Sequence, residues 1–360
     1  MSSQFIDIQL IIRKLASRTN LSENEIYQSI DLILEGKVSE ASIASFLVAL
    51  SMKGETSDEI RAILQSIKKH AIRITPKVIG PLIDTCGTGG DTIKTFNIST
   101  AAAIVACSAG CKVAKHGNRS VSGLCGSADF LEYIGLDLNS PSAIVSQAIE
   151  NIGIGFLYAP KFHPSLYNVS SARKTIGIRT VFNIIGPLCN PCTNISGQVI
   201  GVFEPSLLDT IAVAMQNTDV DEVMLVHAYD GFDELSNTCE NDIIWISGKQ
   251  IKRIRLNPKI LNMMIAKPEQ IIIHSKEDSI RDTLQVIYGV ANQEKEDIVV
   301  LNASAALVIG KIAKDLKEGT LIARSAIKEG KAKKKLLQFI QRYGNKEKLQ
   351  LAEKKFSLNY

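Results

Sequence analysis

The feature that most constrains the fold of this chain is a change of pattern near Pro76. Before this point apolar residues recur with helical spacing, and two capping boxes, Ser22–Glu25 and Thr56–Glu59, mark the starts of helices. Residues 1–73 are therefore predicted to form four helices and no strand. After this point short apolar runs alternate with helical segments, a pattern typical of an α/β sheet. The sequence predicts an α/β protein with a small all-helical N-terminal domain and a large α/β domain.

The second part of the chain contains the following predicted elements. Strands are expected at 78–84, 112–115, 154–159, 198–203 and 222–228, helices at 99–109, 127–134, 207–216 and from Ile280 onward, and a β-hairpin at 242–255 that turns at Ser247-Gly-Lys.

Composition narrows the class of protein. With 360 residues, 45% hydrophobic and 22% charged, the chain can bury a sizeable core. A net charge of +4 is too small to indicate nucleic-acid binding by itself. No apolar run predicts a membrane span, and the N-terminus reads as an amphipathic helix and not as a signal peptide. Seven scattered cysteines without framework spacing are typical of reduced thiols, so a cytoplasmic location is expected.

Two polar motifs flank the first predicted strand–helix junction. The first, Asp84–Asp91 (DTCGTGGD), places glycines where backbone N–H groups can approach an anion, so it is interpreted as a phosphate loop; a tight turn without ligand is the simpler alternative. It is neither a Walker A loop nor a dinucleotide fingerprint. The second, Thr95–Thr100 (TFNIST), gathers polar groups at a helix start. A plain N-cap by Ser99 or Thr100 is the alternative there.

A cluster of polar and basic residues follows the next strand. Within Val113–Ser122 (VAKHGNRSVS), Lys115 and Arg119 are suited to neutralising phosphates at the edge of an α/β sheet. An exposed polar loop is the alternative.

Three further features have weaker signals. The adjacent carboxylates Asp233 and Glu234 are hard oxygen ligands suited to Mg²⁺, although a solvated acidic turn is the commoner explanation of such a pair. Arg173 can bind a carboxylate with two parallel hydrogen bonds, or can simply lie at the surface. Cys189 and Cys192 have C-x-x-C spacing, but a redox or zinc role is disfavoured because no second pair and no thioredoxin-like context accompany them.

Taken together, the motifs resemble the anthranilate phosphoribosyltransferase family. The resemblance extends over roughly residues 8 to 345. It covers, in the family's order, GTGGD, TFNIST, VAKHGNRSVS, GSAD, the His163-Pro pair, ARKTIGIRT, FNIIGPLCNP, DELS and LNASAAL…LKEG…A…GKA. Each piece can occur by chance, whereas the ordered set is highly specific.

The resemblance implies a fold like that of nucleoside phosphorylases and phosphoribosyltransferases. It implies a helical domain at 1–73, joined by helices around 165–186, and an α/β catalytic domain at 74–360. The implied enzyme transfers the phosphoribosyl group of phosphoribosyl pyrophosphate to the amine of anthranilate, uses two Mg²⁺ ions per subunit, and dimerises through its helical domain. Neither a nucleic acid nor a membrane is an expected partner.

Site residues follow from the resemblance, position by position. Contacts to phosphoribosyl pyrophosphate are implied for Gly87, Gly90, Asp91, Thr95, Asn97, Ile98, Ser99, Thr100, Lys115, His116, Gly117, Asn118, Arg119, Ser120, Val121, Ser122, Gly123 and Ser127. Contacts to anthranilate are implied for Gly87, Asn118 and Arg173, and Mg²⁺ ligands for Ser99, Asp233 and Glu234. Lys115 and Arg173 are the predicted catalytic residues. His116 is the one candidate proton acceptor in the loop, although the neutral amine needs no strong base.

The sequence departs from the family pattern at Thr92, Leu124-Cys125, Ser165–Tyr167 and Ser171-Ala172. The last two put the outer part of the anthranilate channel in doubt. Two alternatives are a pyrimidine nucleoside phosphorylase, which would not need the Asp-Glu pair, and a non-catalytic nucleic-acid-binding relative, which would call for a more basic surface.

Overall fold

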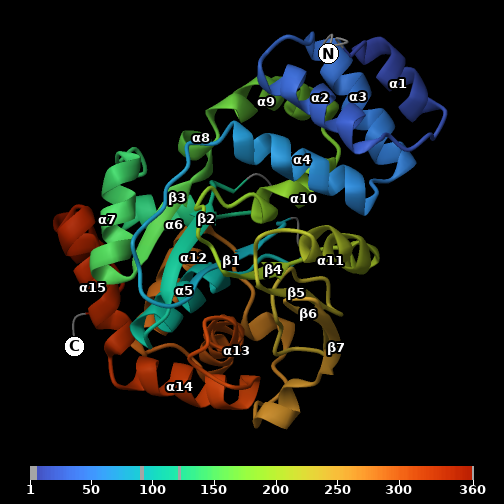
Figure 1. Ribbon diagram of the computed structural model, residues 1–360. Coiled ribbons are helices and arrows are strands. Elements are labelled where there is room, and N and C mark those ends of the chain that lie inside the picture. The colour runs from blue at the N-terminus through green and yellow to red at the C-terminus, as the bar shows by residue number, and fades with distance from the viewer. Residues whose placement is uncertain (1–5, 90–92, 121–122, 359–360) are drawn as a thin grey trace.

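The computed structural model describes residues 6–89, 93–120 and 123–358, and its N-terminal part is helical (Figure 1). The helices are α1 (Ile8–Ala16), α2 (Glu23–Leu34), α3 (Glu40–Lys53) and α4 (Ser57–Lys69). Both predicted capping boxes are present: Ser22 pairs reciprocally with Glu25, and Thr56 with Glu59. The prediction of four helices before residue 73 is confirmed for the described residues.

Seven strands form one sheet in the order β3-β2-β1-β4-β5-β6-β7 within the described ranges. Their bounds are β1 (Leu82–Gly87), β2 (Lys112–Gly117), β3 (Ile154–Tyr158), β4 (Gly197–Gly201), β5 (Glu222–Ala228), β6 (Asn241–Ser247) and β7 (Gln250–Leu256). The first five are parallel, and β6 and β7 form the predicted antiparallel hairpin. The strand order reverses between β1 and β4, which is where open α/β sheets bind ligands.

Most of the remaining helices cover the two faces of this sheet, and one packs against the N-terminal helices (Figure 1). They are α5 (Ile98–Ser108), α6 (Ser127–Tyr133), α7 (Ser142–Ile152), α8 (Ala159–Phe162), α9 (Tyr167–Ile176), α10 (Val181–Leu188), α11 (Leu208–Gln216), α12 (Lys276–Tyr288), α13 (Gln293–Ile309), α14 (Leu316–Lys328), α15 (Lys331–Tyr343) and α16 (Lys346–Lys355).

The sheet divides the apolar core into two clusters because successive strand residues point to opposite faces. Ile83 and Val113 belong to the cluster that contains α5 and α13, whereas Leu82 and Ala114 belong to the cluster shared with α4, α10 and α11. α9 packs against α2 and α3, and α10 against α3 and α4, so these two helices join the N-terminal helices to the sheet. Across the described residues, no helix has both the length and the apolar character needed to cross a membrane.

Several predicted boundaries were wrong. β1 begins at Leu82 and not at Val78, because Gly80 adopts a positive φ and Pro81 lacks a backbone N–H. The strand continues to Gly87 because its last residues pair with β4. α12 begins at Lys276, ahead of the predicted Ile280, because the Ser275 side chain caps its first turn. The helix α7 was not predicted.

Candidate active site at the carboxyl ends of β1, β4 and β5

Two glycines make room for the loop after β5 at the point where the strand order reverses. This loop contains Asp233 and Glu234 and is called the carboxylate loop below. A Cβ atom on Gly201, the last residue of β4, would lie 1.4 Å from the backbone oxygen of Asp233. A Cβ atom on Gly87, the last residue of β1, would lie 2.2 Å from Asp233 Oδ2. Real Cβ contacts are never this short, so both positions require glycine for the loop to approach the sheet.

The carboxylate loop is held at its far side by α13. The side chain of Asn302 accepts a hydrogen bond from the backbone N–H of Leu235 (3.0 Å) and donates one to its carbonyl oxygen (2.7 Å). Phe232 and Leu235, on either side of the Asp-Glu pair, are fully buried. The loop after β5 is therefore positioned by packing and by a two-point hydrogen bond, and it is not the solvated acidic turn that was the alternative.

The two carboxylates lie in a confined environment that disfavours ionisation of both. Asp233 is buried, and its Oδ2 accepts a hydrogen bond from the N–H of Gly89 at 2.5 Å. Burial and the neighbouring Asp233 carboxylate raise the pKa of Glu234 to about 8, against the opposing effect of the Lys115 ammonium. Two adjacent carboxylates that cannot easily both ionise are an arrangement that a divalent cation relieves.

The first turn of α5 faces this pair. The N–H of Ser99 donates a hydrogen bond to Glu234 Oε1 at 3.2 Å. The buried hydroxyl of Thr100 has no hydrogen-bond partner among the described residues. Neither residue is the N-cap, contrary to the simple alternative: Asn97 occupies that position and makes no side-chain cap bond. The Asn97 amide instead donates to Ser279 Oγ at 3.0 Å. The unpartnered Thr100 hydroxyl and the partial positive charge of the helix start favour an anion there.

Lys115 connects β1, β2 and α5. Its buried ammonium donates to the backbone oxygen of Thr85 at 2.5 Å and to Ser99 Oγ at 3.4 Å. Thr85 Oγ1 in turn donates to the backbone oxygen of Ser99 at 3.1 Å. Lys115 thus lies beside Ser99, one of the predicted Mg²⁺ ligands.

The next residue, His116, points to the opposite face of the sheet. Its backbone N–H donates to Asp84 Oδ1 (3.1 Å), and Asp84 Oδ2 accepts from the Asn190 amide (2.8 Å). Burial raises the pKa of Asp84, and burial holds that of His116 well below its ordinary value. Asp84 and Asn190 form a buried bracket that positions the end of β2, a role that sequence reasoning missed.

The described part of the polar segment after β2 is held by hydrogen bonds to Asp129. Asp129 accepts backbone hydrogen bonds from Ser120 (3.1 Å) and Gly126 (3.0 Å). Burial would raise the pKa of Asp129, but these bonds and Lys276 hold it below its ordinary value. Arg119 is paired with both carboxylate oxygens of Glu132 at 2.7 and 2.8 Å, so it would have to exchange partners to reach a phosphate.

The other predicted contacts of this region are placed as follows. Five of them lie at or near the ends of β1, β2 and α5, namely Gly87, Ser127, Gly117, Thr95 and Ile98. Asn118 and Gly123 are exposed. The predicted contacts Gly90, Asp91, Val121 and Ser122 and the departure Thr92 lie outside the described residues.

Arg173 lies on α9, half-buried, with its guanidinium carbon 5.6 Å from the ring centroid of Phe182 on α10. Burial lowers the pKa of Arg173, and no charged neighbour within the described residues contributes to that shift. A half-buried cation in such surroundings is suited to a ligand carboxylate.

The departures around Arg173 lie in different surroundings. Ala172 is buried in the helical core, Ser171 Oγ donates to Glu40 on α3 at 2.7 Å, and Tyr167 is 82% exposed.

The protein-family comparison divides the chain into two matching parts. Residues 9–71 match the glycosyl transferase family, helical bundle domain, and residues 79–333 match the glycosyl transferase family, a/b domain. These ranges agree with the helical and α/β parts of the fold.

Curated relatives share the same name. The anthranilate phosphoribosyltransferase of Acetivibrio thermocellus is 43% identical over 92% of this chain and 95% of its own length. That of Nitrosopumilus maritimus is 38% identical over 94% of this chain and 97% of its own.

Solved structures agree in fold. Anthranilate phosphoribosyltransferase from Thermus thermophilus superimposes with a TM-score of 0.86 at 35% identity, covering 93% of this chain and 99% of that one. The Saccharomyces cerevisiae enzyme in complex with phosphoribosyl pyrophosphate and Mg has a TM-score of 0.85 at 25% identity, covering 93% and 97%. This chain therefore belongs to the anthranilate phosphoribosyltransferase family of glycosyl transferases.

Proposed function

We propose that this protein transfers the 5-phosphoribosyl group of phosphoribosyl pyrophosphate to the amine of anthranilate and releases pyrophosphate, a step of tryptophan biosynthesis. The observation that carries the proposal is the Asp233-Glu234 pair, with Asp233 buried and Glu234 half-buried, which faces the first turn of α5 beside Lys115. In the reaction the C1–oxygen bond to pyrophosphate breaks, a C1–nitrogen bond forms, and the amine loses a proton to water.

Phosphoribosyl pyrophosphate is assigned to the crevice between β1 and β4. The first turn of α5 supplies the partial positive charge of a helix start, and Lys115 supplies a full positive charge. The N–H of Gly89, which donates to Asp233 here, would have to exchange partners to reach a phosphate. The unpartnered Thr100 hydroxyl supplies a further polar contact. The segment from Lys115 to Gly123 would cover this substrate, with Arg119 released from Glu132 when it does so.

Mg²⁺ fits the donor set of this site. Ser99 and Glu234 would hold one ion, and Asp233 and Glu234 a second, so two ions per subunit are proposed. Bound there, the ions supply positive charge that stabilises the departing pyrophosphate. Glu234 must be ionised to bind both ions. Because its pKa without a cation is raised to about 8, a bound cation would be needed to keep the carboxylate ionised at neutral pH.

Anthranilate is assigned to the α9–α10 side of the site. The Arg173 guanidinium would hold the carboxylate, with Asn118 and Gly87 completing the pocket. Holding the amine close to C1 converts a collision of two molecules into an intramolecular step. His116 is an unsuitable base, because its side chain points to the sheet face opposite Lys115 and its pKa is low.

Assembly and location are also proposed. The helical domain is placed at 1–73, joined by helices around 165–186, and the α/β catalytic domain at 74–360. A homodimer would form through the helical domain. Leu10 (52%) and Met52 (71%) are exposed apolar side chains in the helical part, which supports an interface there. The lack of a disulfide among the described cysteines supports a reducing, cytoplasmic location.

The test is the loss of anthranilate fluorescence when phosphoribosyl pyrophosphate and Mg²⁺ are added to the purified protein. We expect turnover that requires both additions. Uracil and thymine, tested with ribose 1-phosphate as the co-substrate and nucleoside formation as the readout, should give none. Turnover of a pyrimidine nucleoside, or salt-sensitive DNA binding without any transfer, would overturn the proposal in favour of one of the two alternatives.

A further inference from the structure

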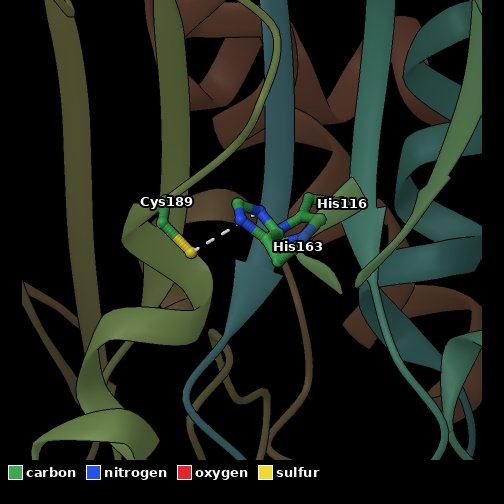
Figure 2. A group of neighbouring side chains, drawn as sticks. All are labelled: His116, His163 and Cys189. Atoms are coloured by element: carbon green, nitrogen blue, oxygen red, sulfur yellow. Dashed lines mark hydrogen bonds between the residues drawn. The ribbon is translucent and has the colours of Figure 1, made fainter. Parts of the chain in front are cut away.

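Three buried side chains from separate segments meet on the α10 side of the sheet (Figure 2). His116 lies near the end of β2, His163 follows α8, and Cys189 follows α10. One potential ligand atom of each lies within 4.8 Å of the other two, and the exposed fractions are 5%, 2% and 0%. The imidazole rings meet edge to face, with centroids 5.1 Å apart. The proposed transfer reaction uses none of these side chains as a chemical group.

The hydrogen-bonding capacity of the cluster is not filled by the protein. His116 Nε2 and His163 Nδ1 are buried and have no hydrogen-bond partner among the described residues. Cys189 Sγ lies 3.9 Å from His163 Nε2, at the limit of a weak contact, and donates to the backbone oxygen of Gly186 at 3.3 Å. Buried polar atoms without partners are rare and destabilising, so the cluster has unused ligand capacity.

The protonation states suit a cation of borderline softness. Burial lowers the pKa of His163 to about 4 and holds that of His116 far below its ordinary value, so both imidazoles are neutral and keep a free lone pair. Burial raises the pKa of the Cys189 thiol to about 12, so a cation must displace its proton. Two imidazole nitrogens and one thiolate form a set that Zn²⁺ prefers and Mg²⁺ does not.

We propose that His116, His163 and Cys189 form a binding site for Zn²⁺ or a similar borderline divalent cation, separate from the carboxylate site. Each imidazole donates a nitrogen lone pair, the Cys189 S–H bond breaks, the thiolate binds the cation and the proton passes to solvent, leaving the fourth position to water. Zn–N and Zn–S bonds of about 2.1 and 2.3 Å require the three ligand atoms to draw together by about 1 Å.

The position of the cluster suggests what binding does. The segment after His116 carries Asn118, the segment after His163 leads into α9 with Arg173, and Cys189 directly follows the last residue of α10. A cation would tie together the three segments that are assigned to anthranilate. We therefore expect it to inhibit transfer; this consequence rests on the proposed function, whereas the binding itself does not.

Binding is tested with Co²⁺ as a spectroscopic probe for Zn²⁺, on Mg²⁺-free protein. A thiolate ligand produces an intense charge-transfer band in the near ultraviolet. We expect this band to saturate at one Co²⁺ per chain, to be removed by added Zn²⁺, and to be absent in Cys189→Ser. Cys192→Ser is the matched control, because Cys192 is equally buried but donates to Asn194, and it should keep the band. His163→Gln should lose it, which covers the case that Cys189→Ser fails to fold.

The outcomes separate cleanly. A wild-type protein without the band, or a band that persists in Cys189→Ser, overturns the site. In the activity arm, preincubation with Zn²⁺ should lower transfer at least about tenfold in wild type and in Cys192→Ser. A protein that shows the cobalt band but no transfer with Mg²⁺ would refute the proposed function and leave the metal site standing.

Discussion

Two consecutive residues of β2, Lys115 and His116, reach regions of opposite character. The carboxylate region, on the α5 side, contains Lys115, Asp233 and Glu234. The imidazole region, on the α10 side, contains His116, His163 and Cys189 (Figure 2). Both regions are largely buried and both lie at the carboxyl edge of the sheet, yet one gathers charges and the other gathers neutral groups.

The difference shows how one strand can hold two different sets of ligand groups, one on each face of the sheet. Burial disfavours charge in both regions, raising the pKa of Glu234 to about 8 and lowering that of His163 to about 4. In the carboxylate region the negative charge lies on oxygen atoms, which bind a hard cation such as Mg²⁺. In the imidazole region nitrogen and sulfur lone pairs suit a softer one. The two-residue period of the strand keeps the two sets apart.

The largest expected effect comes from removing the charges of the carboxylate region. Asp233→Asn with Glu234→Gln should reduce the rate of transfer on the order of a thousandfold, because several kcal/mol of charge stabilisation are lost. Activity is measured by anthranilate fluorescence and the fold by circular dichroism. The cobalt band of the imidazole region should remain, which sharpens the comparison. Full activity of the double variant, or of wild type in excess EDTA, would contradict the metal assignment.

The next effect comes from geometry alone. Gly201→Ala should lower kcat/KM for both substrates by about a hundredfold, because its Cβ cannot occupy the space of the Asp233 backbone oxygen and the carboxylate loop must move. Gly197→Ala, at the other end of β4, is the control, since its nearest contact would be 3.2 Å to a side-chain methyl of Ile83. Equal activity of the two variants would show that the loop does not depend on the glycine.

A smaller and more selective effect is expected at Arg173. Arg173→Ala should raise KM for anthranilate ten- to a hundredfold, because a charge-assisted contact is worth about 1.5–3 kcal/mol, and should leave KM for phosphoribosyl pyrophosphate nearly unchanged. Arg173→Lys should recover only part, since lysine lacks the planar paired donors. The exposed neighbour Lys174→Ala is the control. Parallel changes in both KM values would remove Arg173 from the carboxylate role.

The effect expected in the imidazole region is on stability and not on the rate of transfer. Because the pKa of folded His163 is about 4 and an unfolded histidine titrates near 6.5, the unfolded chain binds more protons between these values. Stability of the metal-free protein should therefore fall as pH drops from about 6.5 to 4, by on the order of 3 kcal/mol from this group. Unfolding by urea at several pH values should show a shallower acid slope in His163→Gln. An unchanged slope would mean that His163 is not held neutral.

Local interactions explain what the sequence determined. The helical N-terminal part, both capping boxes, the alternation of strands and helices and the β6–β7 hairpin could be predicted, because contacts three or four residues apart or across a tight turn produce them. The Gly-rich loop, the polar start of α5 and the Asp233-Glu234 pair were recognisable as ligand chemistry from residue type and order. The start of β1 was misjudged because Gly80 adopts a positive φ and Pro81 lacks a backbone N–H.

Only the tertiary structure decided which distant residues meet. Three sets of contacts join segments that are far apart in the chain. They are the close approach of Gly87 and Gly201 to Asp233, the hydrogen bond between Asp84 and Asn190, and the hydrogen bonds between Asn302 and Leu235. The C-x-x-C spacing does not reveal the partners of its cysteines, since Cys189 contacts His163 while Cys192 contacts Asn194. Such pairs depend on strand order and on which face of a strand each residue occupies, and neither is encoded in spacing along a single segment.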